Sequence, residues 1–569
     1  MDTRPVPDPI TIEILHNTFK SVTDEMFVAL MKSSYSTNIK ERRDHSTAII
    51  DRHGKLIAQA EFSLPIHLGS LLGLVDTILA SLSVEKIQEG DIFIANDPHV
   101  AGGTHLPDIN MAMPVFADSR LVAFVCNIAH HADMGGMSPG SMAGGMSEIY
   151  QEGLRVPLVR LFKADVLDEE ILSILLLNAR IPEERRGDYF AQIAACKLGC
   201  RRLSEVVEKH GSPLIETTFA EIIRRTELRL RQAYKQLPAG RYRFIDYMDD
   251  DGLGTQDIPI VVEATISESH LVLDFRGSSP QVAGNINCTM SATRAAACYS
   301  VKALLDPEIP NNHGVIDAVE IIVDRGSILS AVHPAAVASR AHTCQRVIDA
   351  VIGCFAQAIP LKVVAAANGA NTTAVFAGTD PRTGQDYVYL ETLGGGFGGR
   401  ATKDGMDGVQ VHITNTSNLP VESIESEYPL LVETYGFVED SGGAGKYRGG
   451  LGIRRVVRPI GHTAIFSGTG ERFRHQPWGL FGGLPGHCGR FAIRSDDRTV
   501  LELPGKTPST RINPTECVII ETPGAGGYGR PADRDPTAIV GDLSSGKFSG
   551  EYVTTHYGSG VGVIAGEKS

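Results

Sequence analysis

Near the start of the chain, apolar residues recur every three or four positions from Leu15 to Leu30. This spacing places them on one face of a helix, so the pattern predicts an amphipathic helix over about residues 10–34, entered through Pro9. Further along, the alternation changes to short strand-like runs around the turn at 51–54, where Gly54 suits a positive φ.

Two apolar runs between residues 109 and 129 flank a polar turn at 117–120. They predict a β-hairpin. In this hairpin Asp108 lies opposite residue 129 or 130, within reach of cross-strand side-chain contact. A shift of the register by one residue decides whether His130 or His131 faces Asp108, and the pattern leaves both open.

The remaining pattern divides the chain into regions of an α+β fold, because helices and strands are segregated rather than alternating one for one. Residues 1–165 are expected to form a mixed helix and hairpin region that holds the candidate site, and residues 166–240 a helical block. Residues 241–430 are expected to form an α+β domain, whose alternating runs predict antiparallel strands, with helices at about 290–305 and 343–358. Residues 431–569 are expected to be a β-rich part with many glycine turns.

Composition narrows the functional class. Of 569 residues, 42% are hydrophobic and 21% charged, which is typical of a soluble globular protein, and no apolar run reaches the length of a membrane span. The net charge of −14, without a basic stripe, argues against a nucleic-acid partner. The start of the chain has no signal-peptide pattern, and the nine cysteines form no CxxC pair, so free thiols in a cytoplasmic protein are expected.

Imidazole and carboxylate groups gather in GGTHLPDINM and AHHADMGGM. His105, Asp108 and His130 supply mixed N/O ligands that suit Mn, Zn or Fe(II), provided that the hairpin brings them together. The alternative is a polar loop whose histidines only cap backbone groups. His99 and Asp133 are spare candidates for the same site.

Two other motifs are weaker. Asp44, in KERRDHS, follows two arginines, so it is either an ionised ligand or base, or part of a solvated charge cluster. Gly394, Gly396 and Gly399 fit GxGxxG, but no apolar helix follows them, so a dinucleotide site is rejected in favour of tight turns or a pocket wall. The sequence has no GxxxxGK[ST] motif for ATP.

The chain resembles the hydantoinase B/oxoprolinase family. The motifs that carry the resemblance run in the family's order from about residue 8 to 531: ERRDHSTAIID, GDIFIANDPHVAGGTHLPDINM, NIAHHADMGGMSPGSM, LGGGFGGR, NTSNLPVESIESEYPL, DSGGAGKYRGGLG and TPGAGGYGRP. Members include B subunits of ATP-dependent hydantoinases and caprolactamase, the second half of 5-oxoprolinase, and a subunit of acetone and acetophenone carboxylases.

The resemblance implies a metal site and a partner. In the acetone carboxylase branch, a His-x-x-Asp pair and a later His hold Mn, and these positions match His105, Asp108 and His130. Asp44 gains weight as a fourth ligand or an active-site carboxylate, so Asp44 and Asp108 are the expected catalytic carboxylates. His131 becomes the ligand if the hairpin slips by one residue. ATP is expected on a hydantoinase A type ATPase partner, in a heterotetramer or larger complex.

The expected activity is opening of a hydantoin, 5-oxoproline or lactam ring after the partner phosphorylates its carbonyl. A metal here would generate hydroxide from bound water. Two alternatives stay open: a subunit of an acetone-type ATP-dependent carboxylase, and a non-catalytic scaffold for the ATPase subunit. The sequence leaves the ring and the metal unidentified.

Overall fold

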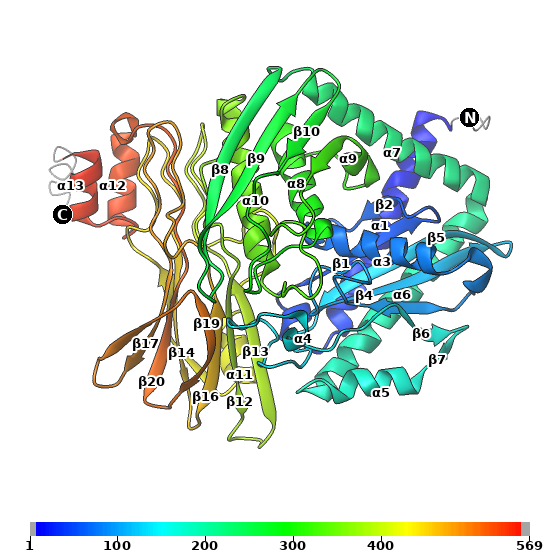
Figure 1. Ribbon diagram of the computed structural model, residues 1–569, viewed down its shortest axis with the longest axis horizontal. Coiled ribbons are helices and arrows are strands. Elements are labelled where there is room, and N and C mark those ends of the chain that lie inside the picture. The colour runs from blue at the N-terminus through cyan, green and yellow to red at the C-terminus, as the bar shows by residue number, and fades with distance from the viewer. Residues whose placement is uncertain (1–6, 559–569) are drawn as a thin grey trace.

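The computed structural model describes residues 7–558, and the N-terminal part of the chain builds a seven-stranded antiparallel sheet (Figure 1). Its strand order is β2-β1-β5-β4-β3-β6-β7. The strands are β1 (His45–Asp51), β2 (Leu56–Gln59), β3 (Ile92–Ala95), β4 (Asp108–Ala117), β5 (Arg120–His130), β6 (Val159–Lys163) and β7 (Val166–Leu167).

Helices cover both faces of this sheet. The predicted first helix is confirmed as α1 (Pro9–Ser33), whose start is capped by the Asp8 side chain. α1 and α6 (Pro182–His210) pack on one face, and α3 (His67–Ser81) packs on the other. The other helices of this part are α2 (Thr37–Lys40), the 3₁₀ helix η1 (Val84–Lys86), α4 (Ile149–Glu152), α5 (Glu169–Leu177) and α7 (Ser212–Tyr234).

The β4–β5 hairpin is confirmed, and a bulge sets its register. Next to the turn, Ala117 pairs with Arg120, a register that would carry Asp108 to a place opposite residue 129. The register shifts by one residue just beyond Phe116, and from there Asp108 pairs with His130. Residues directly opposite each other in an antiparallel pair project to the same side, so the bulge chooses His130 over His131 as the partner of Asp108.

The central part holds a four-stranded sheet in the order β11-β10-β9-β8. The prediction that its strands are all antiparallel is wrong at one pair, because β11 runs parallel to β10. The chain passes through two helices between these strands, and such a crossover returns it in the same direction. The elements are β8 (Gly240–Asp250), β9 (Gln256–Ile266), β10 (Leu271–Asp274), α8 (Met290–Leu305), α9 (His313–Asp317), β11 (Val319–Ile322), α10 (Arg340–Ala356) and η2 (Pro360–Lys362).

Two further sheets, in the orders β13-β12-β16-β19 and β14-β15-β20-β17-β18, lie to the left of the first sheet in Figure 1. Their elements are β12 (Thr372–Thr379), β13 (Asp386–Leu393), α11 (Val421–Glu427), β14 (Leu430–Phe437), β15 (Ile453–Pro459), β16 (Ala464–Thr469), β17 (Arg490–Ser495), β18 (Val500–Leu503), β19 (Lys506–Ile512) and β20 (Glu516–Glu521). The helices η3 (Pro531–Asp533), α12 (Pro536–Ser544) and α13 (Gly550–Tyr557) follow. The whole arrangement is an α+β fold.

Three glycine-rich segments pack backbone against backbone beside these sheets. A Cβ at Gly396 would overlap the Gly450 carbonyl oxygen, and one at Gly449 would overlap that of Ala525. The glycines of LGGGFGGR therefore serve close packing between loops, and no helix begins after them. Between residues 7 and 558 no helix has the length and apolar character needed to cross a bilayer.

Candidate metal centre

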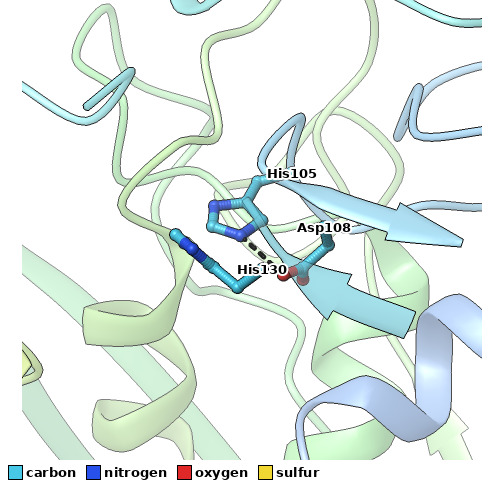
Figure 2. A group of neighbouring side chains, drawn as sticks. All are labelled: His105, Asp108 and His130. Atoms are coloured by element: carbon cyan, nitrogen blue, oxygen red, sulfur yellow. Dashed lines mark ion pairs between the residues drawn. The ribbon is translucent and has the colours of Figure 1, made fainter. Parts of the chain in front are cut away.

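The end of the β4–β5 hairpin brings together three of the predicted side chains. His105, in the loop before β4, and Asp108 and His130, paired across the hairpin, place potential ligand atoms within 4.8 Å of one another (Figure 2). All three side chains are buried. The set contains two imidazoles and one carboxylate, which matches the ligand preferences of Mn, Zn and Fe(II).

The hydrogen bonding of the His105 ring leaves one nitrogen free to bind a cation. Its Nδ1 lies 2.9 Å from the Ala338 carbonyl oxygen, an acceptor, so Nδ1 carries the hydrogen. Burial and the Arg340 guanidinium lower the pKa of His105, so the ring is neutral and Nε2 holds a lone pair. That lone pair points at Oδ1 of Asp108 from 3.1 Å, and neither atom has a hydrogen-bond partner within the described chain. Two buried acceptors facing each other are satisfied by a metal ion between them.

Asp108 stays ionised. Its Oδ2 lies 2.5 Å from the Arg340 guanidinium and accepts a hydrogen bond from the Thr104 hydroxyl at 3.3 Å. Burial alone would raise the pKa of Asp108, but the Arg340 guanidinium, its permanently charged neighbour, opposes burial, and the pKa lies well below its usual range. One carboxylate oxygen is therefore held by the protein, and the other faces the histidines.

His130 is held in place from α2. The Asn38 amide nitrogen donates to the His130 carbonyl oxygen at 2.7 Å and lies 3.0 Å from its Nδ1. The amide oxygen of Asn38 accepts a hydrogen bond from Arg42, which in turn reaches Thr392 near the glycine-rich loop. Burial lowers the pKa of His130 well below its ordinary value, so this ring too is neutral.

Asp44 lines the same cavity without joining the three clustered side chains. Its carboxylate lies 3.7 Å from His67 Nε2, and the same nitrogen lies 3.7 Å from Oδ1 of Asp108. Burial raises the pKa of Asp44 to about 7, an effect that Arg42 opposes and Asp108 reinforces. Asp44 is therefore a carboxyl group that exchanges its proton near neutral pH.

His67 and Arg340 are the two ionisable side chains of this cavity that sequence reasoning missed. Burial lowers the pKa of His67 to about 4. The Ser46 hydroxyl accepts the Leu64 N–H and lies 2.8 Å from His67 Nδ1, so its own hydrogen is free to donate to that nitrogen. The hydrogen of the neutral ring then sits on Nε2, between the two carboxylates.

The sequence contains a weak indication that His67 and Arg340 are buried polar residues. His67 is the one ionisable residue in the run LPIHLGSLLGLV, and Arg340 shares AAVASRAHTC with His342. An ionisable residue in a largely apolar run needs a buried partner. The sequence does not say which partner it meets, because His67 and Arg340 come from helices far from the hairpin in the chain.

The spare candidates have other roles. His131 points away from the centre, where its Nε2 pairs with the Gln192 side chain at 3.0 Å. Asp133 forms an ion pair with Arg180 at 2.8 Å and accepts N–H groups of its own loop. His99 Nε2 bonds the Ala335 carbonyl oxygen at 2.9 Å.

The cavity around the centre is small. It offers about 20 Å³ to the centre of a water-sized sphere, enough for about one water molecule. Its walls combine the residues above with apolar, amide and hydroxyl side chains from distant segments: Leu64, Ile66, Met142, Ala341, Asn371, Thr392, Thr414 and Thr416.

Comparison with known proteins places this chain in a family. Residues 8–531 match the hydantoinase B/oxoprolinase family. The putative B subunit of a D-/L-hydantoinase from Pseudomonas sp. (strain NS671) is 32% identical over 566 residues, which cover 97% of this chain and 95% of that protein.

Solved structures agree. The crystal structure of the ATP-dependent caprolactamase from Pseudomonas jessenii superimposes with a TM-score of 0.91 at 27% identity, covering 97% of this chain and 96% of that one. A nucleotide-free acetone carboxylase structure shares the fold, with a TM-score of 0.89 at 20% identity, covering 97% of this chain and 79% of that one. The chain belongs to the hydantoinase B/oxoprolinase family.

Proposed function

We propose that this chain is the metal-dependent B subunit of an ATP-dependent cyclic amidase. It acts with an ATPase subunit of the hydantoinase A type, which binds ATP and phosphorylates the carbonyl oxygen of a hydantoin, 5-oxoproline or lactam ring. The names of the relatives support the reaction class, because they include the B subunit of a hydantoinase and an ATP-dependent caprolactamase.

The observation that carries the proposal is the pair of acceptors at His105 Nε2 and Asp108 Oδ1, 3.1 Å apart and without other partners in the described chain. These two residues and His130 would hold the metal. A divalent metal in this position supplies Lewis acidity and lowers the pKa of water from about 15.7 toward about 7. The metal is Mn, Zn or Fe(II), since the donor set suits all three.

Ring opening also requires a proton to leave the attacking water and a proton to reach the ring nitrogen. Water adds to the activated carbon and gives up a proton, and the ring C–N bond breaks as the nitrogen receives a proton. A second water then cleaves the resulting acyl phosphate to a carboxylate and inorganic phosphate. Asp44 has a pKa of about 7, so at neutral pH a large share of the molecules carry it as a base. In this scheme Asp44 accepts the proton from water and returns it to the departing nitrogen, while His67 fixes the carboxylate from the other side.

The test is ATP-dependent ring opening by the reconstituted complex. Asp44→Asn removes the base but keeps the shape, so we expect a loss of roughly 10²–10⁴-fold in turnover with metal content retained. The matched control is Asp51→Asn at the other end of β1, a turn residue whose acceptor oxygen the amide keeps. Full turnover in Asp44→Asn would refute the assigned role.

The same complex separates the alternatives. Incorporation of labelled bicarbonate into an organic product, without ring opening, would identify a carboxylase subunit. Unchanged activity after His105→Ala or Asp108→Ala would identify a scaffold for the ATPase subunit.

A further inference from the structure

A second cavity lies on the far side of one wall of the candidate metal centre. It offers about 290 Å³, close to the lower end of the range of roughly 300–1,000 Å³ for small-molecule sites. The centre itself offers about 20 Å³, too little for a five-membered ring. The reacting groups and the space for a substrate are therefore in adjoining compartments.

The wall between them is built from two chain segments whose side chains alternate. In the first segment, Leu64, Ile66 and His67 line the metal centre, whereas Ser63, Pro65 and Leu68 line the larger pocket. In the second segment, residues 414 and 416 face the centre and Asn415 faces the pocket.

Few hydrogen bonds join the two segments. The Ile66 N–H donates to the Ile413 carbonyl oxygen at 3.3 Å, and the Asn415 side chain donates to the Phe62 carbonyl oxygen at 3.3 Å. One layer of residues thus separates the two compartments, and a modest shift of either segment would join them.

The pocket carries hydrogen-bond donors that the protein leaves available. Lys302, on α8, donates to Asn311 Oδ1 at 2.7 Å, which uses one of its three N–H groups on a neutral acceptor. Gln59 lines the pocket, and its side-chain nitrogen is buried without a hydrogen-bond partner in the described chain, so the amide has to turn to reach a molecule in the pocket.

Acidic groups near Lys302 are mostly engaged elsewhere. Glu61 pairs with Lys20, and Asp306 accepts two hydrogen bonds from Arg229. Glu308 also contributes to the field at Lys302. An ammonium with two N–H groups still unused, and an amide nitrogen without a partner beside it, are donors that a carboxylate needs.

We propose that this pocket binds a small carboxylate-bearing molecule that enters or leaves the metal centre across the 63–68 and 414–416 wall. The assignment rests on the proposed function, because hydrolysis of any cyclic amide produces a carboxylate and 5-oxoproline already carries one. Lys302 binds the carboxylate, and Gln59 donates a second hydrogen bond to it.

The test is calorimetric binding to the isolated chain, treated with EDTA and without ATP. The probes are 5-oxoproline and glutamate, with 2-pyrrolidinone as the same ring without a carboxylate. We expect saturable binding of both acids, at least tenfold tighter than binding of pyrrolidinone. Lys302→Met should remove that preference, and Gln59→Leu should weaken the acids severalfold. Arg294→Met is the matched control, since it removes a cation from the same helix outside this pocket.

A second variant blocks the space instead of the charge. Ala303 is exposed and lines the pocket, so Ala303→Phe should fold and exclude both acids. No saturable binding of either acid at millimolar concentration, or equal affinity in wild type and Lys302→Met, would overturn the proposal.

His130→Ala separates this proposal from the proposed function. Its acid binding should equal that of wild type while its ring opening is lost. Acid binding without ring opening in the wild-type complex would refute the proposed function alone, and ring opening without acid binding would refute the pocket alone.

Discussion

Arg340→Met is the sharpest perturbation of the candidate centre that leaves its three candidate ligands in place. Arg340 is the one cation hydrogen-bonded to Asp108, at 2.5 Å, within the described chain. At an effective dielectric of about 20, opposite charges about 4 Å apart attract by about 4 kcal/mol. Breaking a buried pair by removing one partner costs about 3–5 kcal/mol, because the other charge is left uncompensated.

In the metal-free protein, Arg340→Met should therefore lower the free energy of unfolding by about 3–5 kcal/mol. Binding of a divalent cation compensates the same carboxylate, and the variant no longer presents a competing positive charge. We therefore expect Arg340→Met to bind Zn or Mn at least tenfold more tightly than wild type, which is about 1.4 kcal/mol.

The assay pairs urea unfolding followed by circular dichroism, in EDTA and in excess metal, with metal competition against a chromophoric chelator. The control is Arg346→Met, two turns along α10, which removes a buried arginine paired with Glu471. It should lose comparable stability with unchanged metal affinity. Weaker metal binding by a folded Arg340→Met would refute the electrostatic reasoning.

Three further predictions test the supports of the site and the fold. Burial raises the pKa of Glu152 to about 8, and its side chain accepts the backbone N–H groups of residues 337–338. Glu152→Gln keeps an acceptor oxygen, so it should change the free energy of unfolding by less than about 1 kcal/mol. Glu152→Ala leaves both N–H groups unpaired and should lower that free energy by at least about 2 kcal/mol, measured by urea unfolding. Burial lowers the pKa of His45 to about 3, whereas the unfolded chain has a value of about 6.5. Between these two pH values the unfolded chain binds more protons than the folded one, so stability falls as the pH falls. From pH 7 to 5.5 the free energy of unfolding of wild type should fall by about 1.3 kcal/mol more than that of His45→Gln. Gly396→Ala should cost at least about 2 kcal/mol, because its Cβ meets a backbone carbonyl, while Gly436→Ala, with open space around it, should stay within about 0.5 kcal/mol by the same measurement.

The hairpin shows what local pattern can predict. Its two apolar runs and polar turn were sufficient to place Asp108 next to residue 129 or 130, because strand pairing follows from alternation and turn position. The choice between His130 and His131 needed the bulge beyond Phe116, and nothing in the apolar run VFADSRLVAF marks where the extra residue falls.

Contacts between distant segments could not be predicted. His67 and Arg340 reach the centre from α3 and α10, and the parallel pairing of β11 depends on how the intervening helices pack. The resemblance to a known family identified the three clustered side chains, but it gave no place to Arg340, the residue that keeps Asp108 ionised.

Metal content of the purified chain tests the central claim most directly. Plasma mass spectrometry should find close to one equivalent of Mn, Zn or Fe in wild type and almost none in folded Asp108→Ala and His130→Ala. His131→Ala, which changes the neighbouring buried histidine that pairs with Gln192, should keep the metal. Wild type that holds no metal after supplementation and addition of its ATPase partner, or variants that retain it, would contradict the account.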